Sequence, residues 1–413
     1  MTALLLRADR LIDGTGAPPV AAASLLLRDG LVAAVFAGPP PDGAVPPGTA
    51  VIDLPGCTIL PGLIDAHVHL NLPGDGATLE EAVRETDGVL TATATLNAGR
   101  ALRAGITTVR DLGAARNTVF DVRRALTLGH GPAARIVACG QPITITGGHC
   151  WYLGGEADGP ERLRVKVREM CKGGADYIKV MATGGGTLGT MSWRPSFNRE
   201  ELAALVDEAH RQDRTITAHC LCAEAIEWVV DAGFDGIEHA GFLVERSGRQ
   251  EFVPRVADKV AKAGIPCTTT LAVGGSTLRV LRALERPDPQ QRALLDRWER
   301  MSEANLRQFG LMRDAGVSWV AGTDAGWRHT AIEAMPMELA LMAEGGMTAG
   351  EAIHAGTGLA ARVSGLDGVT GTLRPGLRAD VLVVQGNPLD DLWALEKVRL
   401  VLQDGAVRVQ NAA

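Results

Sequence analysis

Short apolar runs that alternate with helix-patterned segments constrain the fold of this 413-residue chain more than any other feature. The runs lie near residues 63–67, 106–110, 135–139, 177–181, 215–219, 235–239, 265–270 and 318–323. Helical patterns occur between them, at 78–104, 161–173, 199–213, 223–233 and 330–345. Repeated strand–helix units predict an α/β fold of the (β/α)8 TIM-barrel type. A doubly wound open sheet is the alternative, but no Gly-rich phosphate loop follows the first strand.

The two ends of the chain are similar to each other and differ from the middle. Near the N-terminus, β-type runs at 24–27 and 31–35 flank Asp29-Gly30, and the C-terminal runs flank a turn at Asp404-Gly405. Asp-Gly between such runs is a strong hairpin signal. We therefore expect one small β domain from residues 1–57 and 366–413, with the barrel, residues 58–365, inserted between them.

Composition limits where the protein acts and what it contacts. The chain has 41 Lys and Arg against 48 Asp and Glu, and its basic residues form no stripe that would attract nucleic acid. No stretch reaches the roughly 18 uninterrupted apolar residues of a membrane span. Seven irregularly spaced cysteines are typical of reduced, buried thiols. We expect a cytoplasmic protein with no nucleic-acid or membrane partner.

Side chains that can bind a metal lie in or at the ends of the predicted strands: His67, His69, Lys179, His219, His239 and Asp324. His67 and His69 share one face of an extended strand, so both can reach one ion. A single histidine at a strand end is more often a core or loop residue. The coincidence of the whole set at the carboxyl ends, where barrel enzymes place their chemistry, favours a metal site.

The chemistry of this set suits a metal ion and leaves room for a second if an anion bridges the two. Imidazole nitrogens with a carboxylate suit a borderline cation such as zinc. Two neighbouring cations need a bridging anion, and Lys179 can supply one if its neutral amine adds carbon dioxide to form a carbamate. An unpaired ammonium in the apolar run Tyr177–Met181 is otherwise costly.

This ligand set resembles that of the binuclear branch of the amidohydrolase superfamily. Residues 60–67, 105–111 and 379–383 resemble its flanking motifs, and the similarity extends over nearly the whole chain. It implies that the terminal β domain is a β-sandwich. Residues 146–149 and 178–185 resemble the prolidase-like and Xaa-carboxypeptidase group, which is related to imidazolonepropionase. That group hydrolyses the C-terminal amide of dipeptides and N-acyl amino acids.

The resemblance implies two divalent metal ions, expected to be zinc. His67, His69 and Asp324 would hold the more buried ion, and His219 and His239 the more exposed one. Lys179, as N6-carboxylysine, and a hydroxide would bridge them. Asp324 would take the proton of the hydroxide and deliver it to the leaving amine, which makes it a catalytic residue.

Three further residues are candidates for substrate binding. By resemblance, His149 hydrogen-bonds the scissile carbonyl oxygen or its oxyanion; the alternative is a structural loop histidine. Arg110 and Arg194 are candidates for gripping a substrate carboxylate. The alternatives are that Arg110 pairs with a neighbouring acid and that Arg194 faces solvent.

Some segments depart from the family pattern. Cys220 and Cys222 follow His219 where small residues are usual, and packing behind the pocket is the favoured role for them. Residues 187–197 resemble the family's loop after the fourth strand, but Trp193-Arg194 is individual to this chain, and the loop is expected to shape substrate choice. Residues 276–314 form a helical stretch, which is a lid, an oligomer contact or a solvated helix.

The sequence thus predicts a metal-dependent hydrolase that cleaves a C-terminal peptide-type amide of a small-molecule substrate, and that forms a homo-oligomer. One alternative is a cyclic-amide, imidazolone or lactone ring hydrolase, or a deaminase, of the same superfamily. Mononuclear relatives typically lack the bridging lysine, so Lys179 discriminates against them. A non-catalytic scaffold is the remote alternative, because every ligand position is filled.

Overall fold

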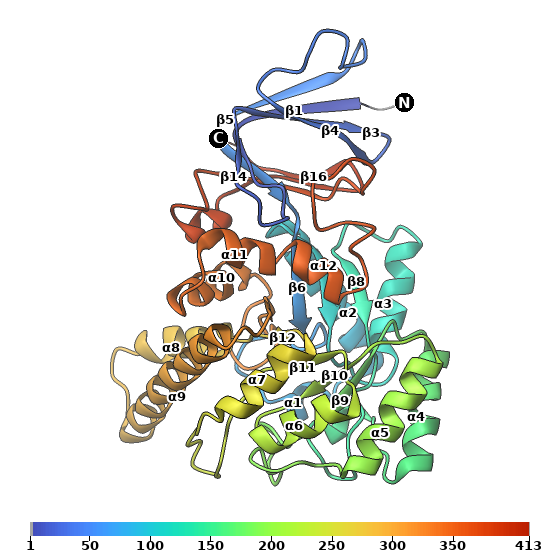
Figure 1. Ribbon diagram of the computed structural model, residues 1–413, viewed down its shortest axis with the longest axis vertical. Coiled ribbons are helices and arrows are strands. Elements are labelled where there is room, and N and C mark those ends of the chain that lie inside the picture. The colour runs from blue at the N-terminus through green and yellow to red at the C-terminus, as the bar shows by residue number, and fades with distance from the viewer. Residues whose placement is uncertain (1–2, 413) are drawn as a thin grey trace.

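Parallel strands form the centre of the molecule, which is a computed structural model that describes residues 3–412 (Figure 1). They are β6 (Leu63–Val68), β7 (Ile106–Asp111), β8 (Arg135–Ala138), β9 (Ile178–Met181), β10 (Ile216–His219), β11 (Gly236–Glu238), β12 (Cys267–Thr268) and β13 (Trp319–Val320). Each lies within or next to one of the apolar runs that predicted it.

These strands form two parallel sheets that are joined at both edges. Their orders are β6-β7-β8 and β13-β12-β11-β10-β9. A parallel bridge joins Ile143, after β8, to Val180 of β9, and another joins Val68 of β6 to Ala325, after β13. Backbone pairing therefore continues around the set in chain order, although isolated bridges complete it at two places. The predicted mixed α/β class is confirmed.

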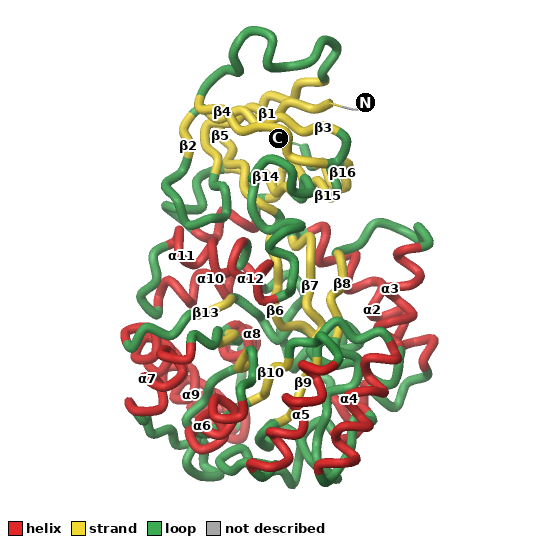
Figure 2. Tube along the Cα trace, turned by 45° about the vertical axis from the view of Figure 1, so that its right-hand side comes forward, coloured by secondary structure: helices red, strands yellow, loops and turns green. Residues whose placement is uncertain are grey.

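Helices surround the strands (Figure 2). They are α1 (Leu79–Ala82), α2 (Asp87–Arg103), α3 (Thr118–Thr127), α4 (Pro160–Gly173), α5 (Arg199–Arg211), α6 (Ala223–Ala232), α7 (Pro254–Ala263), α8 (Ala272–Arg282), α9 (Pro289–Asp314), α10 (Met335–Glu344), α11 (Ala349–Ala355) and α12 (Gly358–Val363). The prediction of one helix over 78–104 was wrong, because Thr86 starts a new helix by accepting a hydrogen bond from Val89 N. Likewise, α10 begins only at Met335, with Pro336 in its first turn.

Strands from both ends of the chain form one eight-stranded sheet, here called the terminal sheet, at the top of Figure 1. Its order is β16-β15-β14-β5-β1-β3-β4, with β2 paired to β1. The bounds are β1 (Ala3–Leu11), β2 (Val20–Ala21), β3 (Ala23–Arg28), β4 (Leu31–Ala37), β5 (Ala50–Pro61), β14 (Val381–Gln385), β15 (Val398–Gln403) and β16 (Ala406–Gln410). Because β5 runs past residue 57 and leads directly into β6, the limits of a separate domain stay a prediction.

Both predicted hairpins are present in the terminal sheet. Asp29 and Gly30 join β3 to β4, and Asp404 and Gly405 join β15 to β16. All four residues have positive φ, as a type I′ turn requires. The sheet has an apolar cluster of its own, to which both termini contribute; it includes Leu6, Leu25, Ile59, Val383 and Leu400.

The terminal sheet lies against the amino ends of the parallel strands. Gln403 Nε2 donates to Thr107 O at 3.1 Å and to Ala133 O at 3.0 Å. Arg135, the first residue of β8, donates to Asp380 at 2.6 Å. These contacts leave the opposite, carboxyl ends of the strands free to form a site.

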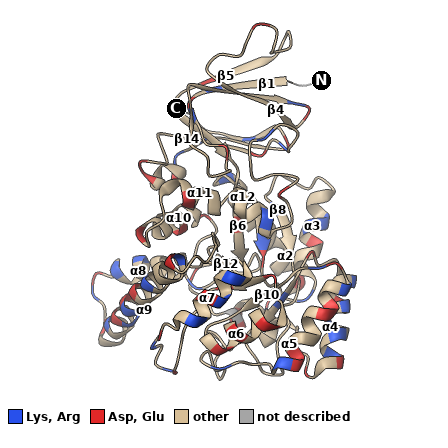
Figure 3. Ribbon diagram, in the orientation of Figure 1, with Lys and Arg blue, Asp and Glu red and all other residues tan. Residues whose placement is uncertain are grey.

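The surface and the cysteines add two observations. Acidic and basic residues alternate along outer helices such as α4 and α5, as the colouring of the ribbon shows (Figure 3). Within residues 3–412, no helix is both long and apolar enough to cross a membrane. All seven cysteines are unpaired, and only Cys171 is not buried.

Candidate metal centre

A cavity of about 360 Å³ lies at the carboxyl ends of the parallel strands. Every predicted ligand lines it: His67, His69, Lys179, His219, His239 and Asp324. Although these residues are spread over most of the chain, each is placed by its strand, and strands that run parallel end together. The structure therefore brings the predicted ligand set to one place.

Three of these side chains form a compact group that can hold a metal ion. One ligand atom each from His67, His69 and Asp324 lies within 4.8 Å of the others. Asp324 Oδ1 is 3.2 Å from His69 Nε2 and 3.6 Å from His67 Nε2. Burial by itself raises the pKa of Asp324, but the neighbouring His67 and His69 outweigh it and lower that pKa below its usual value.

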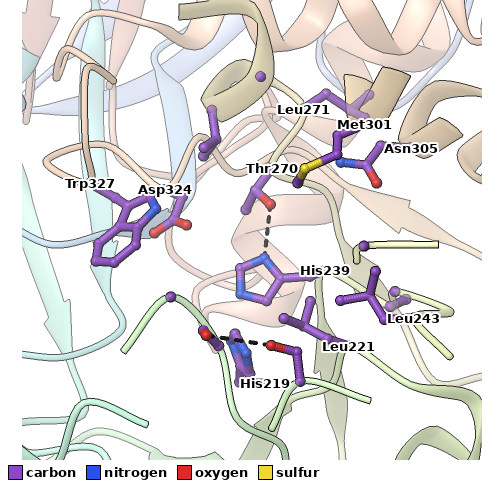
Figure 4. Close-up of a pocket in the computed structure, with 18 of the residues that line it drawn as sticks. His219, Leu221, His239, Leu243, Thr270, Leu271, Met301, Asn305, Asp324 and Trp327 are labelled. Atoms are coloured by element: carbon purple, nitrogen blue, oxygen red, sulfur yellow. Dashed lines mark hydrogen bonds between the residues drawn. The ribbon is translucent and has the colours of Figure 1, made fainter. Parts of the chain in front are cut away.

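The second pair of histidines continues from this group. The His239 ring centroid is 4.9 Å from that of His67 and 4.6 Å from that of His219. In Figure 4, His239 occupies the middle of the view, with His219 and Asp324 on different sides. The rings thus form a continuous row, along which two cations can be placed near each other.

Each of these imidazoles has one nitrogen hydrogen-bonded to the surrounding protein. His67 Nδ1 bonds Glu238 Oε2 (2.9 Å), His69 Nδ1 bonds Gly113 O (3.0 Å), His239 Nδ1 bonds Thr270 Oγ1 (2.8 Å; Figure 4) and His219 Nε2 bonds Gly184 O (3.2 Å). Such bonds fix the ring orientation and leave the other nitrogen for a metal. The donor set therefore fits the predicted divalent ions.

Lys179 has the properties that a carbamate-forming lysine needs. Its side chain is 1% exposed in β9, and no hydrogen bond or ion pair reaches its Nζ from any residue between 3 and 412. Burial is the main cause that lowers the pKa of this amine, which enlarges its neutral, reactive fraction. An unpaired buried amine facing a cavity is difficult to explain by packing alone.

Glu238 orients the ring of His67 through a hydrogen bond. This residue was not identified from the sequence. Arg110 Nη1 lies 3.0 Å from Glu238 Oε1, to which Thr217 Oγ1 also donates at 2.7 Å. Arg110 is 3% exposed, stacks on Tyr177 at 4.0 Å and does not line the cavity. The structure therefore places Arg110 in an ion pair behind the ligands. The feature of the sequence that could have identified Glu238 is its carboxylate directly before the predicted ligand His239.

His149 lines the cavity next to the ligands. Its ring centroid is 4.6 Å from that of His219, and its Nδ1 is 2.8 Å from Thr187 Oγ1. Burial, aided by Lys179, lowers the pKa of His149 to about 3, so the ring is neutral near pH 7. At Gly185, a Cβ would lie 2.4 Å from His149 Nε2, so this glycine is what gives the ring its space.

Other predicted and unpredicted residues define the outer cavity. Arg194 is exposed and does not line it, whereas Trp193 does. From the stretch 276–314, α9 contributes a wall of the cavity that includes Trp298, Met301 and Asn305. Three arginines that the sequence did not single out also line the cavity: Arg246, Arg297 and Arg328.

Left-handed backbone is concentrated around the cavity. Non-glycine lining residues with φ between 50° and 67° are Cys150, His239, Ala240, Asp324 and Arg328. Side chains other than glycine rarely adopt this conformation, and such strain persists where the surrounding structure fixes it for function. The positions of His239 and Asp324 are thus maintained at a conformational cost.

Comparisons with known proteins agree with this geometry. The model of the amidohydrolase family matches residues 58–409. Ochratoxinase from Aspergillus niger is 28% identical over 382 residues, which cover 83% of this chain and 73% of that protein. The imidazolonepropionase of Salinispora arenicola is 27% identical over 386 residues, with 88% and 85% covered.

Solved structures resemble the whole chain. A Xaa-Pro dipeptidase with methionine bound in its active site superposes with a TM-score of 0.84 and 26% identity, covering 98% of this chain and 99% of that one. The A. niger ochratoxinase structure has a TM-score of 0.82 and 26% identity, with 99% and 96% covered. The similarity therefore includes the terminal sheet as well as the body.

Proposed function

The chain belongs to the amidohydrolase family, and from this premise we propose that it is a metal-dependent hydrolase for a C-terminal peptide-type amide. The substrate would be a small molecule such as an Xaa-Pro or other dipeptide or an N-acyl amino acid. The observation that carries the proposal is the convergence of His67, His69, Lys179, His219, His239 and Asp324 on one cavity. In this proposal the body is a (β/α)8 barrel closed by the two bridges, and the terminal sheet corresponds to the β-sandwich.

The residues divide into two metal-binding groups. His67, His69 and Asp324 would hold one divalent ion, and His219 and His239 a second, with carboxylated Lys179 between them. Zinc suits this mixture of imidazole and carboxylate. When bound, such ions lower the pKa of a water molecule and polarise the scissile carbonyl.

Asp324 would carry the proton between the two halves of the reaction. Its carboxylate faces the cavity beside His69, and its lowered pKa keeps it ionised, so it can accept a proton from the attacking water. It would then deliver that proton to the nitrogen of the leaving amine, which cannot depart as an anion.

His149 is positioned to donate a hydrogen bond into the cavity. Thr187 Oγ1 accepts from Cys150 N at 3.0 Å and lies 3.2 Å from Tyr152 Oη; if Tyr152 also donates to it, the Thr187 hydroxyl hydrogen is directed to His149 Nδ1. If Thr187 donates to Nδ1 of the neutral ring, the proton of His149 lies on Nε2. That N–H would stabilise negative charge as it develops on the carbonyl oxygen.

A second candidate function is hydrolysis of a ring amide. An imidazolonepropionase is 27% identical to this chain, almost as similar as ochratoxinase at 28%. This similarity favours a ring amide as the substrate. Lys179 favours the first candidate, since by resemblance the ring hydrolases with a single metal lack the bridging lysine. A lactone remains within the same chemistry.

Amino-acid release tests the substrate class directly. Protein supplied with zinc and bicarbonate is incubated with Xaa-Pro peptides, other dipeptides and N-acyl amino acids, and the products are measured by mass spectrometry. We expect release of the C-terminal amino acid from at least one series, and none from the Asp324→Asn variant. Protein with two ions per chain that opens only cyclic amides or lactones would contradict the substrate class.

A further inference from the structure

The three arginines that line the cavity have no partner for their charge. No hydrogen bond or ion pair to the guanidinium of Arg246, Arg297 or Arg328 comes from residues 3–412. The acidic residues of the lining are engaged elsewhere, because Glu245 pairs with Arg249 and Asp324 lies against His67 and His69. The outer cavity therefore carries three guanidinium groups that no described carboxylate pairs with directly.

Arg328 differs from the other two because aromatic rings hold it. Its guanidinium carbon is 5.4 Å from the ring centroid of Trp327 and 5.5 Å from that of Trp298. Trp327 follows β13, whereas Trp298 belongs to α9, so two separate elements position one cation. Stacking on aromatic faces leaves the N–H groups of arginine available to bind an anion.

The backbone also fixes where Arg328 lies relative to the reacting centre. Its φ is 51°, and its carbonyl oxygen accepts a hydrogen bond from Gly76 N at 2.7 Å. Trp327 N donates to the main-chain carbonyl oxygen of Asp324 at 3.1 Å, which ties this turn to the backbone of the residue that carries the proton. Figure 4 shows the Trp327 ring beside Asp324. A short, hydrogen-bonded turn thus fixes the backbone of Arg328 relative to that of Asp324.

The packing of Trp327 supports a built site. A Cβ at Gly186 would lie 2.5 Å from Trp327 Cζ2, so the ring approaches the loop after β9 as closely as glycine permits. Burial lowers the pKa of Arg328, and the nearby charge of Arg297 lowers it further. Asp324 and Glu80 act on Arg328 in the opposite direction, but neither forms an ion pair with it, so the two neighbouring guanidinium groups favour the binding of an anion.

We propose that Arg328, held between Trp298 and Trp327 and assisted by Arg297, binds the free carboxylate of the substrate and so selects amides of amino acids. This assignment rests on the proposed function for the hydrolysis itself. Arg328, which lines the cavity, would thus bind the carboxylate for which Arg110 and Arg194 were the candidates from the sequence. The carboxylate would lie at the mouth, with the amide directed toward Asp324.

A matched pair of substrates isolates the carboxylate. N-acetyl-L-leucine and N-acetyl-L-leucinol contain the same scissile amide, but a hydroxymethyl group replaces the carboxylate in the second. Because Arg328 is only partly buried, we expect the wild-type protein to prefer the acid in kcat/KM by roughly 10- to 30-fold, the lower part of the range for a hydrogen bond to a charged group. In Arg328→Gln this preference should fall to about 1, mainly through KM.

A control on α9, the helix that supplies Trp298, separates local charge from net charge. Arg300 is on α9, is exposed and does not line the cavity, so Arg300→Gln should keep the wild-type preference. Arg328→Lys should recover only part of the preference, since an ammonium lacks the planar fork of the guanidinium.

Binding without turnover keeps this proposal separate from the proposed function. N-methylsulfonyl-L-leucine and the corresponding alcohol cannot be hydrolysed at an amide, and their binding to metal-loaded protein is followed by tryptophan fluorescence. The acid should bind more tightly in the wild type and equally in Arg328→Gln. If no amide is cleaved but this pattern holds, the proposed function fails and the anion site stands. Equal binding in the wild type, or an unchanged preference in Arg328→Gln, would overturn the role of Arg328.

Discussion

The two ends of the parallel strands are built from the same backbone but differ in how their polar groups are used. At the amino ends, Asp380 accepts hydrogen bonds from Arg135 at 2.6 Å, Thr370 at 2.8 Å and Asp404 N at 2.9 Å. At the carboxyl ends, Lys179 Nζ has no partner among the described residues, and four imidazoles each leave one nitrogen for the cavity. The amino ends of the strands join the terminal sheet to the body, whereas the carboxyl ends keep side-chain nitrogens available to bind a ligand.

This difference shows that buried polar groups have two distinct roles within one fold. A buried group that is fully hydrogen-bonded specifies structure, whereas a buried group that faces a cavity without a partner is available to a ligand. Backbone strain follows the same division. In the terminal sheet, left-handed Asp29 and Asp404 lie in turns that favour them, but left-handed His239 and Asp324 line the cavity. Substitutions at the two ends should therefore differ in kind.

The largest effect is expected at Lys179. Lys179→Ala should lose most bound metal and lower kcat/KM by roughly a thousandfold, since bound metals contribute several kcal/mol to the transition state. The free energy of unfolding without metal should not fall, because the substitution removes an unpaired buried amine. Metal analysis, kinetics and urea unfolding measure the three quantities. Lys172→Ala, on the exposed side of α4, is the control. Full activity of Lys179→Ala would eliminate the bridging role.

At the other end, Asp380→Ala should affect stability and leave catalysis unchanged. We expect a loss of about 2–3 kcal/mol in the free energy of unfolding. This is less than for a fully buried pair, because Arg135 is 20% exposed and retains Asp404. Urea unfolding gives the first quantity, and kcat measured well below the transition gives the second. A loss of kcat in the folded variant would show that the two ends are coupled.

Glu238→Gln tests a residue that connects structure to function. The bond from His67 to Glu238 orients a ligand, so its weakening should reduce metal affinity by about 10- to 100-fold. Competition with a chromophoric chelator measures this affinity. Thr217→Val removes only one hydrogen bond to Glu238 and should have a smaller effect. Unchanged metal affinity in Glu238→Gln would mean that His67 is held by packing alone.

The smallest effect is expected in the apolar cluster of the terminal sheet. Ile59 is fully buried there, and Ile59→Val should lower the free energy of unfolding by about 1 kcal/mol. The variant should keep wild-type kcat/KM and metal content. A change in either would contradict the separation between the two ends.

Strands and ligands were predictable because both follow local rules. An apolar run of strand length specifies β6 or β10, and the rule that parallel strands end together brings His67 and His219 to one cavity. The hairpins at Asp29 and Asp404 were predictable for the same reason, since the turn residues determine them.

What the sequence could not supply were contacts between separated segments. Arg328 is positioned in part by the ring of Trp298 in α9, and neither residue belongs to a recognisable sequence motif. For Arg110, the sequence offered carboxylate binding or pairing with a neighbouring acid; the ion pair with Glu238 confirms the second, but the sequence could not name this partner. The break between α1 and α2 depended on the cap at Thr86, which helical periodicity alone does not reveal.

The most direct test of the account is the number of metal ions per chain. Protein purified from cells supplied with zinc and bicarbonate should contain two ions per chain by mass spectrometry of the metals. X-ray anomalous scattering should place one ion at His67, His69 and Asp324 and the other at His219 and His239. A single ion, with Lys179 unmodified, would contradict the account and favour a mononuclear hydrolase or deaminase.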